Sequence, residues 1–194
     1  GVAVPGTGEA STVATRFQFE TAAKGDASRA DRFEFQDDVF ESPTAERPVI
    51  GLWWYGDTES PPKRIHLEAY RLTDLDAAVA AFRSLRTQPD WASWSTEGLV
   101  DTAPLRRVVN VNAPLQPVEN ASFVRLPKAL PAGWYLLQHD DGTRPIQAIL
   151  QVTDLAGYMA VSTTRTVVWA NDLDGGGAVS GATVMAPCRS LGMT

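Results

Sequence analysis

The sequence predicts an all-β protein, built as an immunoglobulin-like β-sandwich with one short inserted helix. Three observations lead to this prediction. Apolar and polar residues alternate in about ten short segments, and alternation is the period of a strand. One segment alone has helical period, and strands and helices do not alternate as in βαβ folds. With 194 residues, 44% hydrophobic and 21% charged, the chain has the composition of a globular protein.

Strand-like segments dominate the chain up to residue 72. Residues 1–12 are rich in Gly, Ser, Thr and Ala and are interpreted as a flexible lead-in. The dense apolar run Val49–Tyr55 is typical of a strand covered on both faces. Alternating side chains predict three further strands, at 16–20, 33–35 and 64–71.

A single helix is predicted near residues 74–86. Thr73 offers an N-cap hydroxyl, and Asp76 follows three residues later as in a capping box. Apolar residues then recur on one helical face, and Gln88-Pro89 ends the helix. The apolar positions are Leu75, Val79, Phe82 and Leu85. Because strand-like segments flank it, we interpret the helix as an insertion on a β scaffold.

The second half predicts two hairpins. Residues 90–120, which contain several prolines, are interpreted as irregular. Residues 134–138 and 146–152 form the first hairpin, joined by a turn at Asp140-Asp141-Gly142. Residues 153–157 are interpreted as a connector. The second hairpin pairs residues 164–170 with 179–185 across a glycine-rich turn at 172–177, which we interpret as a turn and not as a calcium loop.

These elements suggest two units of unequal size. Residues 13–153 have enough strands for one sandwich, and residues 155–194 have strands for the start of a second, incomplete β module. Forty residues bury too little surface to be stable alone. We therefore expect residues 155–194 to pack on the first unit or to pair with another chain.

Composition and motifs argue against several classes of function. The net charge of −6, from 17 Lys+Arg against 23 Asp+Glu, makes nucleic acid an unsuitable partner. His66 and His139 are interpreted as solvated side chains, and no zinc-ligand spacing occurs. No apolar run reaches the roughly 18 residues of a membrane span. The sequence thus predicts no catalytic residue, no cofactor, no metal site and no membrane-spanning segment.

The tryptophans are the candidates for an interaction surface. The chain has six of them. Four occur as two pairs that are close in sequence, Trp53 with Trp54 and Trp91 with Trp94. Neighbouring residues in a strand point to opposite faces. At most one of Trp53 and Trp54 can therefore face the core of a two-layer sandwich, and the other covers a neighbouring element or a partner.

Three segments in the second half resemble the bacterial alpha-2-macroglobulin-like family. Leu130–Leu137 is similar to its "L-x-x-G-x-Y-hydrophobic" strand, and Leu150–Leu155 to its interdomain "hydrophobic-V-T/S-D-L" segment. Val167–Val184 resembles the "V-W-V-x-D-L-x-T-G-x-P-V-x-G-A-x-V" opening of the following domain. The residues that carry the resemblance are Gly133, Tyr135, Asp154, Trp169, Asp172, Gly181 and Ala182.

The resemblance implies tandem macroglobulin-type β-sandwich domains in an extracytoplasmic protein, either periplasmic, cell-surface or secreted. Members of the family are thought to trap proteases, and many carry a reactive Cys-Gly-Glu-Gln thioester. Here the single cysteine, Cys188, is followed by Arg189-Ser190-Leu191, so the thioester motif is absent from this chain. The resemblance therefore implies a fragment of a longer polypeptide, or a relative reduced to its first modules.

The leading hypothesis is a non-catalytic structural and interaction fragment of such a protein. Its partners would be other domains of the same polypeptide and, through the whole protein, proteases. The alternative is a carbohydrate-binding or adhesin-like sandwich that uses exposed tryptophans. A third hypothesis, a hydrolase using loop carboxylates such as Asp37-Asp38 and Asp140-Asp141, requires two acids that face each other across a cleft.

Overall fold

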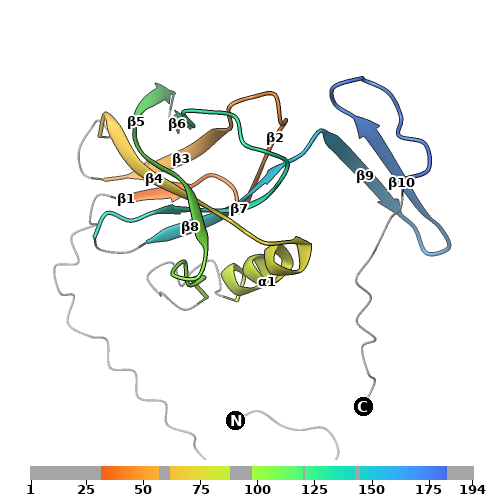
Figure 1. Ribbon diagram of the computed structural model, residues 1–194, viewed down its shortest axis with the longest axis horizontal. Coiled ribbons are helices and arrows are strands. Elements are labelled where there is room, and N and C mark those ends of the chain that lie inside the picture. Colours follow the sequence, from red (N-terminus) through yellow and green to blue (C-terminus); the bar gives the residue numbers. More distant parts are fainter. Residues whose placement is uncertain (1–31, 57–61, 88–97, 120, 143–144, 183–194) are drawn as a thin grey trace, which may run out of the picture.

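The computed structural model describes residues 32–56, 62–87, 98–119, 121–142 and 145–182 (Figure 1). Within these residues the regular secondary structure consists of ten strands and one helix, so the predicted all-β fold with an inserted helix is confirmed. The elements are β1 (Arg32–Phe35), β2 (Val39–Ser42), β3 (Val49–Tyr55), β4 (Arg64–Arg71), α1 (Leu75–Leu85), β5 (Arg106–Val118), β6 (Ala121–Arg125), β7 (Gly133–His139), β8 (Ile146–Val152), β9 (Leu155–Val161) and β10 (Thr166–Asp172).

One eight-stranded sheet curls over itself to form the sandwich. Its strand order is β1-β3-β6-β5-β4-β7-β8-β2, and β9 and β10 form a separate two-stranded sheet. The long strand β5 belongs to both layers, because residues 106–114 pair with β4 and residues 115–118 pair with β6. Every pairing is antiparallel except that of β2 with β8, which is parallel.

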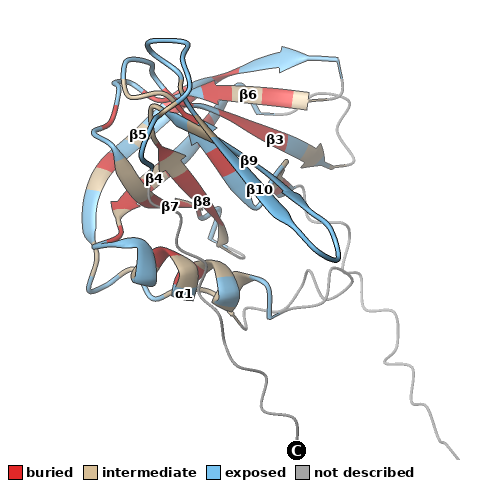
Figure 2. Cartoon of the chain, turned by 90° about the vertical axis from the view of Figure 1, so that its right-hand side faces the viewer, coloured by how far each residue is buried: buried red, intermediate tan, exposed pale blue. Residues whose placement is uncertain are grey.

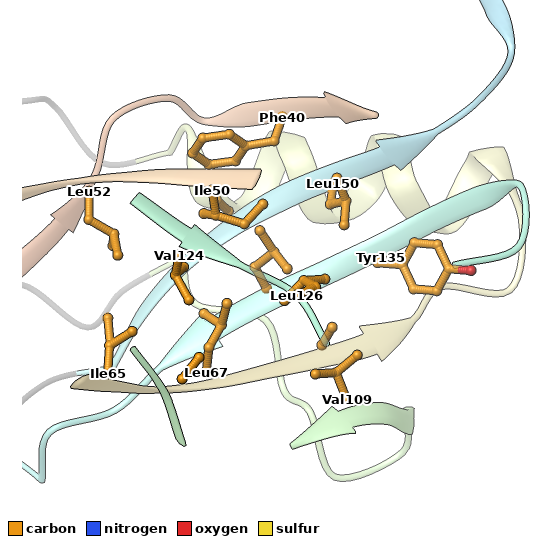
Figure 3. Packing of buried hydrophobic residues seen from close by; sticks show 14 of the residues in the cluster. Phe40, Ile50, Leu52, Ile65, Leu67, Val109, Val124, Leu126, Tyr135 and Leu150 are labelled. Carbon is orange, nitrogen blue, oxygen red and sulfur yellow. The ribbon is translucent and has the colours of Figure 1, made fainter. Parts of the chain in front are cut away.

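The main core lies between the two layers (Figure 3). Inward-facing positions of alternate strand residues supply it, as the period of two requires. Its largest fully buried side chains come from strands of both layers and from the loop after β6: Ile50, Leu52, Ile65, Leu67, Val124, Leu126, Tyr135, Leu137, Leu150 and Val152.

Tyr135 closes one corner of this core. Its ring is buried, and its hydroxyl donates a hydrogen bond to the Pro131 carbonyl at 2.6 Å, four residues upstream. Arg71 in turn hydrogen-bonds to the Tyr135 hydroxyl. Together with the strand order, this tyrosine corner is a feature of immunoglobulin-like sandwiches. Position 133 favours glycine, because its φ of 141° is a backbone conformation that other residues rarely adopt.

A second, smaller core lies on the outer face of β7 and β8, beneath α1. Leu136 and Ile149 point out of the sandwich and pack against Ala78 and Ala81 of the helix. The helix begins where predicted, but its N-cap is Asp74 and not Thr73. The Asp74 carboxylate accepts the Ala77 N–H at 2.8 Å, and Thr73 only donates to Asp74.

Two predictions about the course of the strands are wrong. Residues 106–118 form β5, although residues 90–120 are predicted to be irregular; Pro114 and Pro117 lie where the strand passes from one layer to the other. The expected connector ends at Asp154, because β9 begins at Leu155.

The start of the second predicted hairpin is present in the described residues, but β10 also pairs with a strand, β9, that the prediction lacks. Strand β10 pairs over its whole length with β9. The chain after the turn meets β10 only at its end, through the bridge Asn171↔Ala178 and a Val179 N–H bond to the Ala170 carbonyl. Residues 183–185 lie outside the described residues, as does the predicted strand at 16–20.

Candidate interaction surface

The β9–β10 hairpin presents apolar side chains on both of its faces. Because side chains alternate along a strand, the register divides them into two sets. The first face holds Leu155, Met159, Val161 and Val168, and the second holds Tyr158, Val167 and Trp169. We call these seven residues the hairpin surface.

All seven residues of the hairpin surface are exposed. Tyr158 and Met159 retain 62% of their accessible area and Trp169 retains 54%. Figure 2 shows the contrast with the sandwich, in which buried residues are frequent. The sandwich therefore does not cover the hairpin surface, and its coverage by another chain or module stays a prediction.

The two aromatic residues of the hairpin surface form a cross-strand pair. Tyr158 and Trp169 are register partners, with ring centroids 6.3 Å apart. Among the fourteen residues of the two strands, the only charged side chain is Asp172, at the end of β10. An apolar surface with aromatic residues and few charges is the composition of a protein–protein interface core.

A two-residue junction, Thr153-Asp154, joins the hairpin to the sandwich. The Asp154 carboxylate accepts two hydrogen bonds from Thr44, one from its N–H at 2.7 Å and one from its hydroxyl at 2.5 Å. The Asp154 carbonyl accepts the Leu173 N–H at 2.7 Å, next to the last register pair of the hairpin. Asp154 therefore contacts the sandwich with its side chain and the hairpin with its backbone.

The parallel pairing of β2 and β8 explains why Thr44 and Asp154 meet. Ser42 is the register partner of Val152, and the Thr153 N–H continues the ladder to the Ser42 carbonyl at 3.0 Å. Two residues further along each chain are Thr44 and Asp154. The hydrogen bonds from the Thr44 hydroxyl and N–H hold the pKa of Asp154 below its ordinary value.

The predicted tryptophan surface is only partly assembled. Trp53 is 39% exposed on the outer face of β3, whereas Trp54 packs against Phe33 with ring centroids 4.8 Å apart. This agrees with the expectation that at most one of the two faces the core. Trp91 and Trp94 lie outside the described residues. Tyr158 and Trp169, an exposed aromatic pair of the described chain, are not among the residues predicted to form an interaction surface.

The two histidines differ in exposure and in their hydrogen-bond partners. His66 is exposed, and its Nε2 lies 2.9 Å from Asn110 Oδ1. The expectation of solvation is wrong for His139, which is buried at the end of β7, where its Nδ1 lies 2.7 Å from the His66 carbonyl oxygen. Across the described ranges, no three His, Cys, Asp or Glu side chains gather in a way that could hold a metal ion.

The loop carboxylates form an ion pair with an arginine or accept hydrogen bonds from nearby backbone N–H groups. Asp38 pairs with Arg86 in an exposed ion pair, and Asp140 accepts the N–H of Gly142 at 2.8 Å. Asp172 accepts the Asp174 N–H at 3.0 Å within the glycine-rich turn. Within the part of the chain that the structure describes, no helix is long and apolar enough to cross a membrane.

An apolar groove of about 200 Å³ lies beside α1. Leu75, Val79 and Phe82 of the helix form one wall, and Val39 and Trp134 of the sheet contribute to the other. The groove marks where the helix leaves part of the outer face of the sheet uncovered.

The remaining residues of the family resemblance lie on structural positions. Tyr135 and Gly133 form the corner described above, and Asp154 forms the junction. Gly181 has a positive φ of 74° and, with Ala182, is exposed just before the end of the described residues. Thr44, the partner of Asp154, carries no signal in the sequence that marks it as part of a site.

Comparisons with known proteins assign no family to this chain. No protein-family model matches the chain, and no curated protein matches it. Among solved structures, a marsupial T cell receptor is similar over 73% of this chain and 67% of that chain, with 7% sequence identity and a TM-score of 0.31. Similarity at this level adds nothing to the topology described above.

Proposed function

We propose that the chain is a non-catalytic structural and interaction segment of an alpha-2-macroglobulin-like protein outside the cytoplasm. In this proposal the sandwich is one macroglobulin-type module, and the β9–β10 hairpin begins a second one. The observation that carries the proposal is the hairpin surface, which is apolar on both faces and exposed to solvent in the described chain. A two-stranded hairpin is marginally stable in water without packing partners.

The positions of the resembling residues support this division. Tyr135 lies inside the sandwich, Asp154 lies at the junction and Trp169 lies in the hairpin, in the order in which the family motifs follow one another. The chain after the turn meets the outer edge of β10 at Asn171↔Ala178. Further strands of a second module could add to the hairpin from that edge.

In this proposal the partners are other domains of the same polypeptide. Proteases would be bound only through the whole protein, by a trap in which cleavage causes compaction. Limited proteolysis of the whole protein tests the trap: cleavage is expected to compact the protein and to retain the protease. Cleavage without compaction and without retention would contradict the trap.

Hydrogen exchange tests the second module. The chain is compared with a longer product that includes the residues encoded after Thr194. We expect the amides of residues 155–172 to exchange more slowly in the longer product, because the added strands cover the hairpin surface. Trp169→Ser should reduce that protection, whereas Val118→Ser, at an exposed strand position of the sandwich, should leave it unchanged.

Two results would overturn the proposal of a second module. One is a reading frame that closes directly after Thr194. The other is equally fast exchange of the hairpin amides in the two products, since a strand pair built into a module must gain protection.

A second candidate function, carbohydrate binding, has one observation in its favour. Trp53 and Tyr55 are exposed on the same face of β3, and Arg32 lies over the Tyr55 ring at 5.6 Å from its centroid. Arg32 also hydrogen-bonds to Glu34 at 3.1 Å. An aromatic face beside polar groups suits a sugar ring.

Tryptophan fluorescence titrated with cell-wall and plant polysaccharides tests carbohydrate binding. A saturable shift that Trp53→Ala abolishes and Trp169→Ala retains would support this candidate. The absence of a saturable shift with every sugar would remove it.

A further inference from the structure

We propose that Asp154 is the positioning residue that sets the direction in which the hairpin surface is presented relative to the sandwich. The junction is short: β8 ends at Val152 and β9 begins at Leu155, so the backbone angles of Thr153 and Asp154 alone decide how the hairpin leaves the sandwich. Neither residue is glycine or proline. A bond that holds either residue therefore acts directly on the direction of the hairpin.

Three hydrogen bonds meet at Asp154, and they reach two different parts of the fold. Its carboxylate accepts two from Thr44, in the loop between β2 and β3, at 2.7 and 2.5 Å. Its carbonyl accepts one from Leu173, just beyond the end of β10. Through this one residue, the loop of the sandwich is connected to both strands of the hairpin.

The pair of bonds from Thr44 resists rotation better than a single bond. Two donors on the same residue hold both oxygens of the carboxylate, so the side chain cannot turn about its own axis without losing one of them. Hydrogen bonds to an ionised carboxylate are also stronger than neutral ones. Both residues are half-buried, which limits competition from water.

Thr153 supports the same arrangement from the other side of the peptide. Its N–H donates to the Ser42 carbonyl at 3.0 Å, and its hydroxyl accepts the Leu155 N–H at 3.1 Å. Thr153 is thereby an extension of the β2–β8 ladder, and Asp154 is the first residue free to turn. The carboxylate–Thr44 contact holds the chain at that turning point.

Pulsed EPR distance measurement on the chain itself tests the proposal. Spin labels are attached to Lys128→Cys on the sandwich and Thr163→Cys at the tip of the hairpin, both exposed positions, in a Cys188→Ser background. With Asp154 present, we expect a single narrow distance distribution. Asp154→Ala should lose that narrow peak, because no side-chain bond then holds the junction.

Two graded variants and one control sharpen the test. Thr44→Val keeps the backbone N–H but lacks the hydroxyl, and Asp154→Asn keeps one acceptor oxygen without the charge, so both should broaden the distribution less than Asp154→Ala. Asp101→Ala is the matched control, because its carboxylate accepts a local N–H, that of Ala103 at 2.9 Å. It should leave the distribution unchanged.

The distance distribution separates positioning from a general loss of stability. Hydrogen exchange of the sandwich strands reports whether each variant remains folded, and if Asp154→Ala unfolds the sandwich, Thr44→Val and Asp154→Asn decide. A narrow, unshifted distribution in the folded Asp154 variants would overturn the proposal, as would a broad distribution in the parent chain. This measurement needs no second module, so its failure is distinct from a failure of the proposed function.

Discussion

The chain contains two consecutive hairpins that are apolar on both faces, and within the described residues only the first is covered by other elements. In the β7–β8 hairpin, Leu137 and Leu150 face the sandwich core, while Leu136 and Ile149 face α1. In the β9–β10 hairpin, the apolar side chains of both faces are exposed. A strand pair that is apolar on both faces needs a covering layer on each, and among the described residues the second pair has neither.

The largest expected effect comes from the same substitution in the two hairpins. Leu150→Ala removes a fully buried side chain and should lower the free energy of unfolding by about 2–5 kcal/mol. Leu155→Ala, at an exposed position, should change it by less than about 0.5 kcal/mol. Urea unfolding measures both. Equal losses would show that the second hairpin is already packed in the isolated chain.

Removing one tyrosine hydroxyl group should lower the free energy of unfolding by a smaller amount, and only in the β7–β8 hairpin. Tyr135→Phe deletes the bond to the Pro131 carbonyl and the acceptor for Arg71, and should cost about 1–2 kcal/mol. Tyr158→Phe, at an exposed position, should cost less than about 0.5 kcal/mol. Thermal unfolding compares the two variants, and a Tyr158→Phe loss as large as that of Tyr135→Phe would contradict the contrast.

A smaller, pH-dependent effect is expected from the helix that covers the first hairpin. The Ala77 N–H, followed by the Thr73 hydroxyl, holds the pKa of Asp74 below its ordinary value. A lowered folded-state pKa adds stability above the unfolded-state pKa, and this stability is lost as pH falls through the folded-state pKa.

The urea midpoint of Asp74→Asn measures this effect. At neutral pH the variant should be slightly less stable than the parent, because Asn still caps the helix but lacks the charge. The difference should close as pH falls below the ordinary range of an aspartate. A difference that is constant with pH would contradict the assignment.

The smallest effect on stability should accompany a clear change in surface properties. Replacing both Tyr158 and Trp169 by Ser should leave the urea midpoint nearly unchanged but reduce the binding of an apolar fluorescent dye, because it removes the aromatic part of the hairpin surface. Trp53→Ser is the control at another exposed tryptophan. If the control reduces dye binding as much, the hairpin is not the main apolar surface.

The elements that the sequence predicts correctly are those whose signals are local. The β7–β8 hairpin follows from alternation around a turn with Gly142, and the helix follows from apolar residues at helical spacing. Strand β5 escapes prediction because its prolines normally end strands, whereas here they lie near the bend between layers. Strand β9 escapes it because Gly157 and the alanines weaken its pattern.

The candidate site is less predictable than the fold. Asp154 is singled out through a family resemblance, but its partner Thr44 lies 110 residues away in the chain. The two meet because β2 and β8 pair in parallel, and no local pattern specifies such a pairing. The exposure of Tyr158 and Trp169 likewise depends on what covers them, which a strand's own residues do not encode.

The parallel pairing of β2 with β8 has a mechanical consequence. If neighbouring modules pull on the N-terminal end of β2 and the C-terminal end of β8, the two strands are drawn in opposite directions along their length. The bonds between them, such as Ile149 N–H to the Asp38 carbonyl and Thr153 N–H to the Ser42 carbonyl, are then loaded together in shear and cannot open one at a time. In a protein built of tandem modules, the β2–β8 pairing would therefore resist unfolding under tension.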